Sequence, residues 1–299
     1  IVLSFVVKPA QRVQLVLQGK ADITTNDAGQ PLDVPLAHRP RLHIRPQPTA
    51  FYLSLNASQP PFDDVRARQA LNYALDRGKL VRLGGGPDVA TAACQVLPPN
   101  FPGYKPYCPY TVDPKPATEW TGPDMAKAQS LVAASGTTGE EVAFWWHSEF
   151  GKPGAQYIEQ LLDSLGYRAR VRLFSGDIGD YFTAVDSSAA SWQIAGSGWI
   201  ADYPAASQFI QLVSCSYHFN LGHFCDRAID AKISRALKLQ ERDPAAASES
   251  WAALDREVTD KAPWVTLYTF NSADFVSERV GNYQHHPIWG ALFAQFWVR

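Results

Sequence analysis

Residues 62–81 read FDDVRARQALNYALDRGKLV, the stretch that determines the fold more strongly than any other part of the chain. Asp63 or Asp64 is suited to cap a helix that runs from residue 65 to about residue 80. Apolar side chains recur along one face of this helix, at Val65, Ala67, Ala70, Leu71, Ala74 and Leu75. The glycine run at 84–86 lacks the G-x-x-x-x-G-K-[ST] arrangement of a phosphate-binding loop, so it predicts a flexible turn.

On both sides of this stretch the sequence alternates between helical and strand patterns. Helices are expected over 11–18, 123–134, 153–165 and 226–239, with another from Asp243 onward. Strands are expected over 21–24, 51–55, 142–147, 169–174, 192–197 and 264–270. This alternation is typical of an α/β fold in which helices cover a sheet.

The composition is that of a globular protein and excludes some functions. Hydrophobic residues make up 46% and charged residues 19% of the 299 residues. The formal net charge is -2 and no stretch concentrates Lys and Arg, so nucleic-acid binding by bulk electrostatics is not expected. No apolar run approaches the roughly 20 residues that cross a bilayer. The 9 Trp, 12 Tyr and 15 Phe fit either a binding cleft or a large aromatic core.

The four cysteines form two local pairs along the chain. Cys94 and Cys108 bracket one short irregular loop, and Cys215 and Cys225 bracket another, so local disulfides are expected. Disulfides would place the protein outside the reducing cytosol. Zinc is the alternative, because four potential ligands lie together in Cys215, His218, His223 and Cys225. Their spacing matches none of the usual structural zinc patterns, and zinc would leave the other two cysteines without a role.

Several segments, in order, resemble family 5 solute-binding proteins, which bind peptides, nickel complexes and related solutes. The 62–81 helix resembles the signature helix of that family, and WQIAGSGWIADYPAASQF at 192–209 resembles the strand and turn that reach into its ligand cleft. LVLQGKADI at 15–23, LPPNFPGY at 97–104 and KAPWVTLY at 261–268 also resemble family segments. The resemblance implies a two-lobed, type II periplasmic-binding-protein-like α/β fold that is truncated at the N-terminus. Residues 1–88, completed by 268–299, would be the remainder of the first lobe, and residues 89–267 the second lobe.

The resemblance also implies a function. The chain would bind a small solute, above all a peptide, in a cleft between the lobes and deliver it to the membrane subunits of an ABC importer. It would be an extracytoplasmic monomer without a cofactor. Relatives normally carry a further N-terminal half-lobe and a small accessory domain, so we expect a fragment, a clipped form or a separately expressed C-terminal portion.

The candidate ligand residues follow the expected strand at 192–197. Ligands of open α/β sheets bind at the carboxyl ends of strands. Asp202 can accept charge-assisted hydrogen bonds from an ammonium group, and the resemblance implies this role for the α-amino group of a peptide. Asp202 can equally cap a helix that begins near Pro204. Trp199 is suited either to line the pocket or to pack in the core.

A second candidate group is Trp145, Trp146 and His147, at the end of the strand expected over 142–147. Because side chains of a strand alternate between its faces, one Trp faces each way, and at most part of this group lines a cleft. His147 is the least supported of the ligand candidates.

Enzymatic function is not expected. The sequence around Ser197 reads AGSGW, which is not a G-x-S-x-G nucleophile elbow, and no H-E-x-x-H occurs. His285 and His286 have no carboxylate at metalloprotease spacing, so a zinc-dependent enzyme is the least supported alternative. A stronger alternative is the ligand-sensing domain of a larger regulatory protein, because the same binding fold can be joined to a signalling or DNA-binding domain.

Overall fold

The computed structural model describes residues 1–6, 8–26, 31–114, 117–187 and 189–299. Its main sheet has eight strands in the order β1-β8-β3-β7-β5-β6, with β2 and β4 also paired to β8. The strands are β1 (Ile23–Asn26), β2 (Leu42–Pro46), β3 (Thr49–Leu55), β4 (Ala90–Ala92), β5 (Glu141–His147), β6 (Arg168–Phe174), β7 (Ile194–Ile200) and β8 (Trp264–Val276). β5 runs parallel to β6 and β7, and the other pairs are antiparallel.

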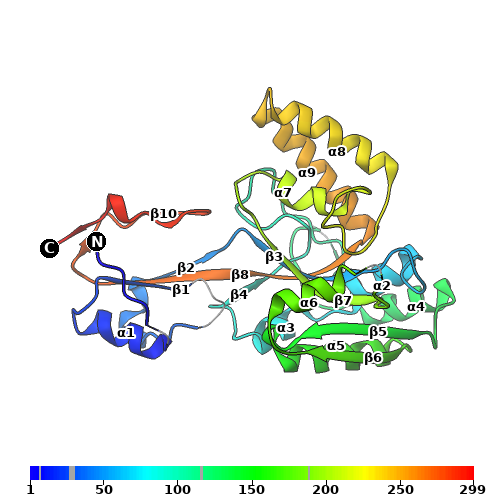
Figure 1. Cartoon of the computed structure of the whole chain (residues 1–299), viewed down its shortest axis with the longest axis horizontal. Coiled ribbons are helices and arrows are strands. Elements are labelled where there is room, and N and C mark those ends of the chain that lie inside the picture. Colours follow the sequence, from blue (N-terminus) through cyan, green and yellow to red (C-terminus); the bar gives the residue numbers. More distant parts are fainter. Residues whose placement is uncertain (7, 27–30, 115–116, 188) are drawn as a thin grey trace.

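The longest strand, β8, connects two parts of the molecule (Figure 1). Its first half pairs with β3 and β4, and its second half, from Asn271, pairs with β1 and β2. Helix α1 (Pro9–Leu17) packs beside the second half, where Val13, Val16 and Phe275 share a small core. The chain ends on this side of the molecule in two short antiparallel strand pairs (Figure 1). β9 (Val280–Gly281) pairs with β12 (Trp297–Val298), and β10 (His285–His286) pairs with β11 (Gly290–Ala291).

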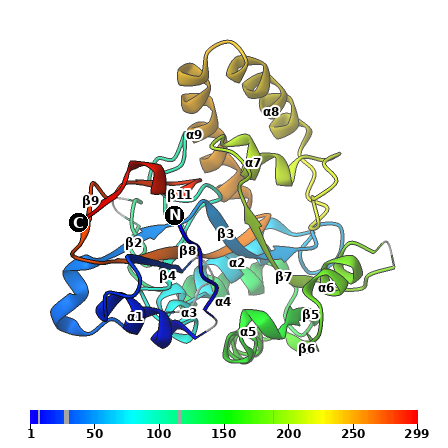
Figure 2. The ribbon, with the colours of Figure 1, turned by 60° about the vertical axis from the view of Figure 1, so that its left-hand side comes forward.

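Helices cover both faces of the larger part of the sheet (Figure 2). One face carries α2 (Val65–Ala74), α3 (Arg77–Leu83), α4 (Met125–Ser135) and α5 (Lys152–Ser164). The other face carries α6 (Ile178–Val185), α7 (Ser207–Ile210), α8 (Arg227–Gln240) and α9 (Pro244–Lys261). β3 is therefore buried on both sides: Phe51, Leu53 and Leu55 face the first group, and Ala50 and Tyr52 the second. No helix of the described residues is long and apolar enough to cross a membrane.

The helix expected over 65–80 is two helices in the structure. α2 ends at Ala74, Leu75 is extended, and α3 begins at Arg77. The side chain of Asp76 accepts a hydrogen bond from the backbone N–H of Lys79, so a new N-cap interrupts the apolar pattern. The expected cap at the start is confirmed, because Asp64 accepts a hydrogen bond from the N–H of Arg66.

α2 and α3 lie on the first-lobe side of the boundary expected at residue 88. Both helices precede that boundary, yet they share one core with β5 and α5, which follow it. Leu71, Leu80, Phe144 and Ile158 all belong to this core. The physical reason is the apolar face of the 62–81 stretch, which is buried under the same sheet as the later helices.

Candidate ligand-binding site

β7 lies between β3 and β5 and carries two glycines that the close packing requires. A Cβ atom at Gly196 would lie 2.6 Å from the ring of Trp146, and one at Gly198 would lie 3.1 Å from the ring of Phe51. The Gly-Ser-Gly run of β7 thus lets large aromatic rings pack directly on the backbone. The chain leaves the sheet after Ile200, where the N–H of Ala201 donates to the carbonyl of Pro48 at 2.9 Å.

Asp202 lies at this corner with its side chain exposed to solvent. Its backbone N–H donates to Oε1 of Gln208 at 3.0 Å, which fixes the turn. Its carboxylate makes no hydrogen bond or ion pair with any described residue. The alternative that Asp202 caps the next helix is wrong, because α7 has Ala206 at its N-cap and no side-chain cap. The carboxylate is therefore free to interact with a ligand.

Trp199 lies three residues before Asp202 and is half-buried. It pairs with Ala50 of β3 on the face covered by α7 and α9, and its ring contacts Phe219 with centroids 5.1 Å apart. Its Nε1 atom is buried and has no hydrogen-bond partner among the described residues. An indole N–H of this kind is a donor without an acceptor, so the side chain is not a fully satisfied core Trp.

The two tryptophans of β5 face opposite sides of the sheet, as strand alternation predicts. Trp145 is buried with Tyr181 and Trp192 on the α6 face, and the guanidinium of Arg172 lies 4.8 Å from the centre of its ring. It is a packed side chain with 8% of its surface exposed. Trp146 is 1% exposed and donates from Nε1 to the carbonyl of Gly151 at 3.1 Å.

Trp146 nevertheless lines a cavity of about 230 Å³ at the carboxyl end of β5. Most of the wall is apolar or aromatic, and it includes Leu80, Leu83, Phe150, Tyr268 and Phe270. The wall also includes Gly151 and Gly154 at the start of α5. The hydroxyl of Tyr268 has no hydrogen-bond partner among the described residues, and burial raises the pKa of this group. The cavity suits an apolar group of a ligand.

His147 is fully buried, so direct ligand contact is not available to it in this structure. Its Nδ1 accepts a hydrogen bond from the N–H of Glu149 at 3.3 Å, and its Nε2 is buried without a partner among the described residues. The hydroxyl of Ser197 on β7 is also buried without a hydrogen-bond partner among the described residues. The β5–β7 register places His147 and Ser197 on the same face of the sheet.

The cysteines pair as the sequence predicts. Cys94 is bonded to Cys108 with Cα atoms 4.9 Å apart, and Cys215 to Cys225 with Cα atoms 4.5 Å apart. Because Cys215 and Cys225 are bonded to each other, their sulfurs are not available as zinc ligands. No group of three metal-ligating side chains occurs among the residues that the structure describes.

Sequence reasoning missed most of the cavity around Trp146. Leu80, Phe150, Tyr268 and Phe270 come from three separate regions of the chain, and each reads as an ordinary core residue. No local motif connects them. Only the pairing of β8 with β3 brings the last two next to the end of β5.

Comparison with known proteins identifies the family. The model for bacterial extracellular solute-binding proteins, family 5 middle region, matches residues 1–220. The chain belongs to family 5 of the bacterial extracellular solute-binding proteins. Among curated members, it is 27% identical over 237 residues to the glutathione-binding protein GsiB of Escherichia coli K12, which covers 72% of this chain and 41% of that protein. The chain thus spans less than half the length of the curated relatives it matches.

Solved structures show the same type II periplasmic-binding-protein fold. HbpA2 from Haemophilus parasuis matches with a TM-score of 0.77 at 18% identity, over 97% of this chain and 56% of that one. The putative peptide-binding protein AppA from Clostridium difficile also has a TM-score of 0.77, at 16% identity over 99% and 60% of the two chains. DppA from Helicobacter pylori, solved with the peptide STSA, has a TM-score of 0.71 at 17% identity over 96% and 55%. The family and fold expected from the sequence are confirmed.

Proposed function

We propose that this family 5 chain binds a small peptide between two lobes, as a monomer outside the cytosol, for delivery to the membrane subunits of an ABC importer. The observation that carries the proposal is the free carboxylate of Asp202 at the end of β7. An ammonium group of a ligand is the partner that such a carboxylate favours. The two disulfides support a compartment that is not reducing.

The printed names of the relatives support a peptide as the ligand class. GsiB binds glutathione, and the Helicobacter pylori DppA structure contains the peptide STSA. The aromatic cavity at Trp146 adds a place for an apolar side chain near the same end of the sheet. Gly198, whose backbone packs on the Phe51 ring, lies four residues before Asp202, so the chain between these two residues spans at most about 14 Å.

We also propose a division into lobes that differs from the one expected at residue 88. One lobe consists of residues 49–270, and the other of residues 1–46 with residues 271–299. The support is the sheet pairing, because β8 changes partners from β3 and β4 to β1 and β2 at Asn271. The β2–β3 connection at Gln47 and Pro48 passes from one lobe to the other beside Phe270 and Asn271 of β8. These two connections between the lobes would act as the hinge.

The test is the substitution Asp202→Asn, which removes the charge and keeps the size. If the α-amino group of a peptide binds here, affinity falls by roughly 1–3 kcal/mol, the scale for losing a charged hydrogen-bond partner. Isothermal titration calorimetry with a panel of di- and tripeptides measures the change. Asp163→Asn is the matched control, because Asp163 is exposed on α5 and its carboxylate has no partner among the described residues. Equal affinities in the wild type and Asp202→Asn would remove Asp202 from the site.

A further inference from the structure

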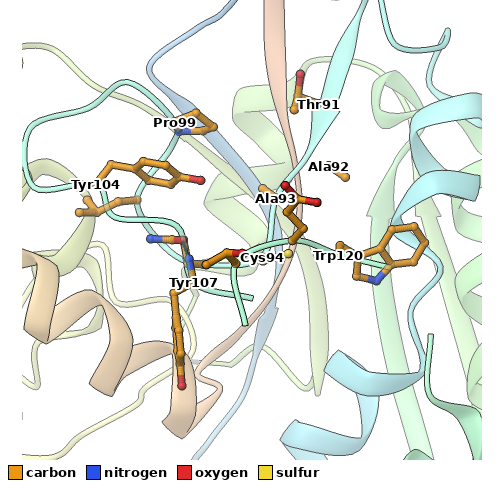
Figure 3. Close-up of a pocket in the computed structure, with 12 residues that line it drawn as sticks. Thr91, Ala92, Ala93, Cys94, Pro99, Tyr104, Tyr107 and Trp120 are labelled. Atoms are coloured by element: carbon orange, nitrogen blue, oxygen red, sulfur yellow. Dashed lines mark hydrogen bonds between the residues drawn. The ribbon is translucent and has the colours of Figure 1, made fainter. Parts of the chain in front are cut away.

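A second cavity, here called the Trp120 cavity, lies at the free edge of β4 (Figure 3). Its volume is about 270 Å³. Among the described strands β4 pairs only with β8, and its residues Thr91 and Ala92 line the cavity. The rest of the wall comes from the loop closed by the Cys94–Cys108 disulfide and from residues 118–120. These elements are not part of the candidate site at Asp202.

Aromatic rings form two walls of the Trp120 cavity. Figure 3 shows the rings of Tyr104 and Trp120 on opposite sides of the space, with Ala93 and Cys94 between them. Both aromatic side chains are half-buried, which keeps their rings accessible from the cavity. The faces of Trp and Tyr rings carry negative electrostatic potential and attract cations.

The charged side chain in the wall of the cavity is negative, as is the electrostatic potential at the faces of the aromatic rings. Glu119 is the one charged side chain among the described lining residues, and its carboxylate makes no ion pair with any of them. Two basic groups beside the wall have described partners, and Tyr107, which contacts Arg256, is itself a lining residue. Lys105 forms an ion pair with Glu249, and the guanidinium of Arg256 lies 5.3 Å from the centre of the Tyr107 ring. The cavity therefore offers a carboxylate without a described cation.

The free edge of β4 adds a backbone acceptor. The N–H of Ala93 donates to the carbonyl of Leu267, and the N–H of Asn271 donates to the carbonyl of Val89. Because residues of an antiparallel strand alternate in the direction of their backbone groups, the N–H and carbonyl of Ala92 point away from β8. Ala92 lines the cavity, and its carbonyl has no hydrogen-bond partner among the described residues.

We propose that the Trp120 cavity binds a small organic cation, with its ammonium group between Tyr104 and Trp120 and Glu119 as the counterion. Two aromatic faces, an unpaired carboxylate and a free carbonyl form a site that favours positive charge and disfavours anions. The volume of about 270 Å³ accommodates a small quaternary ammonium compound. The site is independent of the peptide site and would bind whether or not a peptide is present.

The probes for the test are choline and 3,3-dimethylbutan-1-ol, its neutral analogue in which carbon replaces nitrogen. Calorimetry with the full chain is expected to show saturable choline binding and at least about tenfold weaker binding of the neutral analogue. Glu119→Gln keeps the shape of the exposed side chain and is expected to weaken choline binding about fivefold to tenfold. Trp120→Leu is expected to weaken it further. Glu241→Gln is the matched control, because Glu241 is exposed at the end of α8 and lines neither cavity.

Three outcomes would overturn the proposal. Equal affinity for choline and the neutral analogue would show a cavity that is merely apolar. Unchanged choline affinity in Glu119→Gln would remove the counterion. Choline affinity that falls in Asp202→Asn but not in Glu119→Gln would place the cation at the peptide site. Because a failure of peptide binding leaves all three measurements intact, the two proposals can be tested separately.

Discussion

Arg68, Asn72 and Arg77 attach the 62–81 stretch to the end of α9 and to β8 through backbone carbonyls. Arg68 donates to the carbonyls of Lys261 and Ala262, and Asn72 donates to the carbonyl of Trp264. Arg77 is fully buried and donates to the carbonyls of Ala93 and Thr266 at 2.8 and 3.0 Å. Burial lowers the pKa of Arg77 to about 10, which still leaves it protonated at neutral pH.

Arg77→Met is expected to destabilise the protein by about 2–4 kcal/mol. The substitution keeps much of the side-chain volume but leaves several buried carbonyls without their donor. Urea unfolding followed by circular dichroism measures the free energy. Arg168→Met is the control, because Arg168 is exposed on β6 and its guanidinium has no described partner. Similar unfolding free energies for the two variants would show that the Arg77 network is not important for stability.

At the scale of elements, α9 holds the proline-rich segment after β4 through one buried carboxylate. Asp255 accepts hydrogen bonds from the backbone N–H groups of Val96 and Leu97 and from the side chain of Gln95. Gln95 also accepts a hydrogen bond from the N–H of Tyr107 and donates to the carbonyl of Lys105. The first turn of this segment and the end of its disulfide loop are thus fixed to the same helix.

The stability of the fold is expected to depend on the protonation of Asp255. Burial raises its pKa from 3.8 to about 7, against the opposing effect of its hydrogen bonds. A carboxyl with a raised pKa binds its proton more tightly in the folded state, so its contribution to stability is full below about pH 4 and is lost as pH rises to about 7. Thermal unfolding from pH 4 to 8 measures this dependence.

Asp255→Asn should remove that part of the pH dependence. The amide oxygen of Asn can still accept from Val96 and Leu97, so the variant is expected to fold. Glu241→Gln again serves as the control, since its exposed carboxylate should leave the profile unchanged. A variant profile with the slope of the wild type would show that Asp255 titrates at its ordinary pKa.

On the scale of the whole molecule, both disulfides lie in the larger part of the protein, in segments with little regular structure. Cys94–Cys108 closes the segment after β4, and Cys215–Cys225 closes the segment between α7 and α8. The sequence separations are 14 and 10 residues. Each disulfide stabilises a segment in which few helices or strands do so.

Removing either disulfide is expected to lower the unfolding free energy by roughly 3 kcal/mol, the loop-entropy value for loops of these lengths. The variants are Cys94→Ser with Cys108→Ser, and Cys215→Ser with Cys225→Ser. Urea unfolding measures each free energy, and titration of free thiols in the wild type checks the pairing. Free thiols in the unreduced wild type would contradict the disulfides and reopen the zinc alternative.

Local sequence patterns were enough to predict the local features of this protein. Helical and strand periodicity, the cap at Asp64 and the disulfide pairing depend on residues close together in the chain, so local patterns predict them. The family could also be predicted from the sequence, because the 62–81 stretch and the corner before Asp202 are contiguous segments. The exposed carboxylate of Asp202 could not be predicted from the sequence, because the choice between a helix cap and a free carboxylate depends on where α7 begins.

Which side chains share a cavity depends on long-range contacts that no local pattern predicts. Strand alternation predicted that Trp145 and Trp146 face apart, but the surroundings of each depend on contacts with distant strands and helices. The same contacts bury His147 and bring Trp120 opposite Tyr104. The physical reason is that burial and cavity shape arise from long-range packing, whereas the periodicity of a segment reports only which of its faces is apolar.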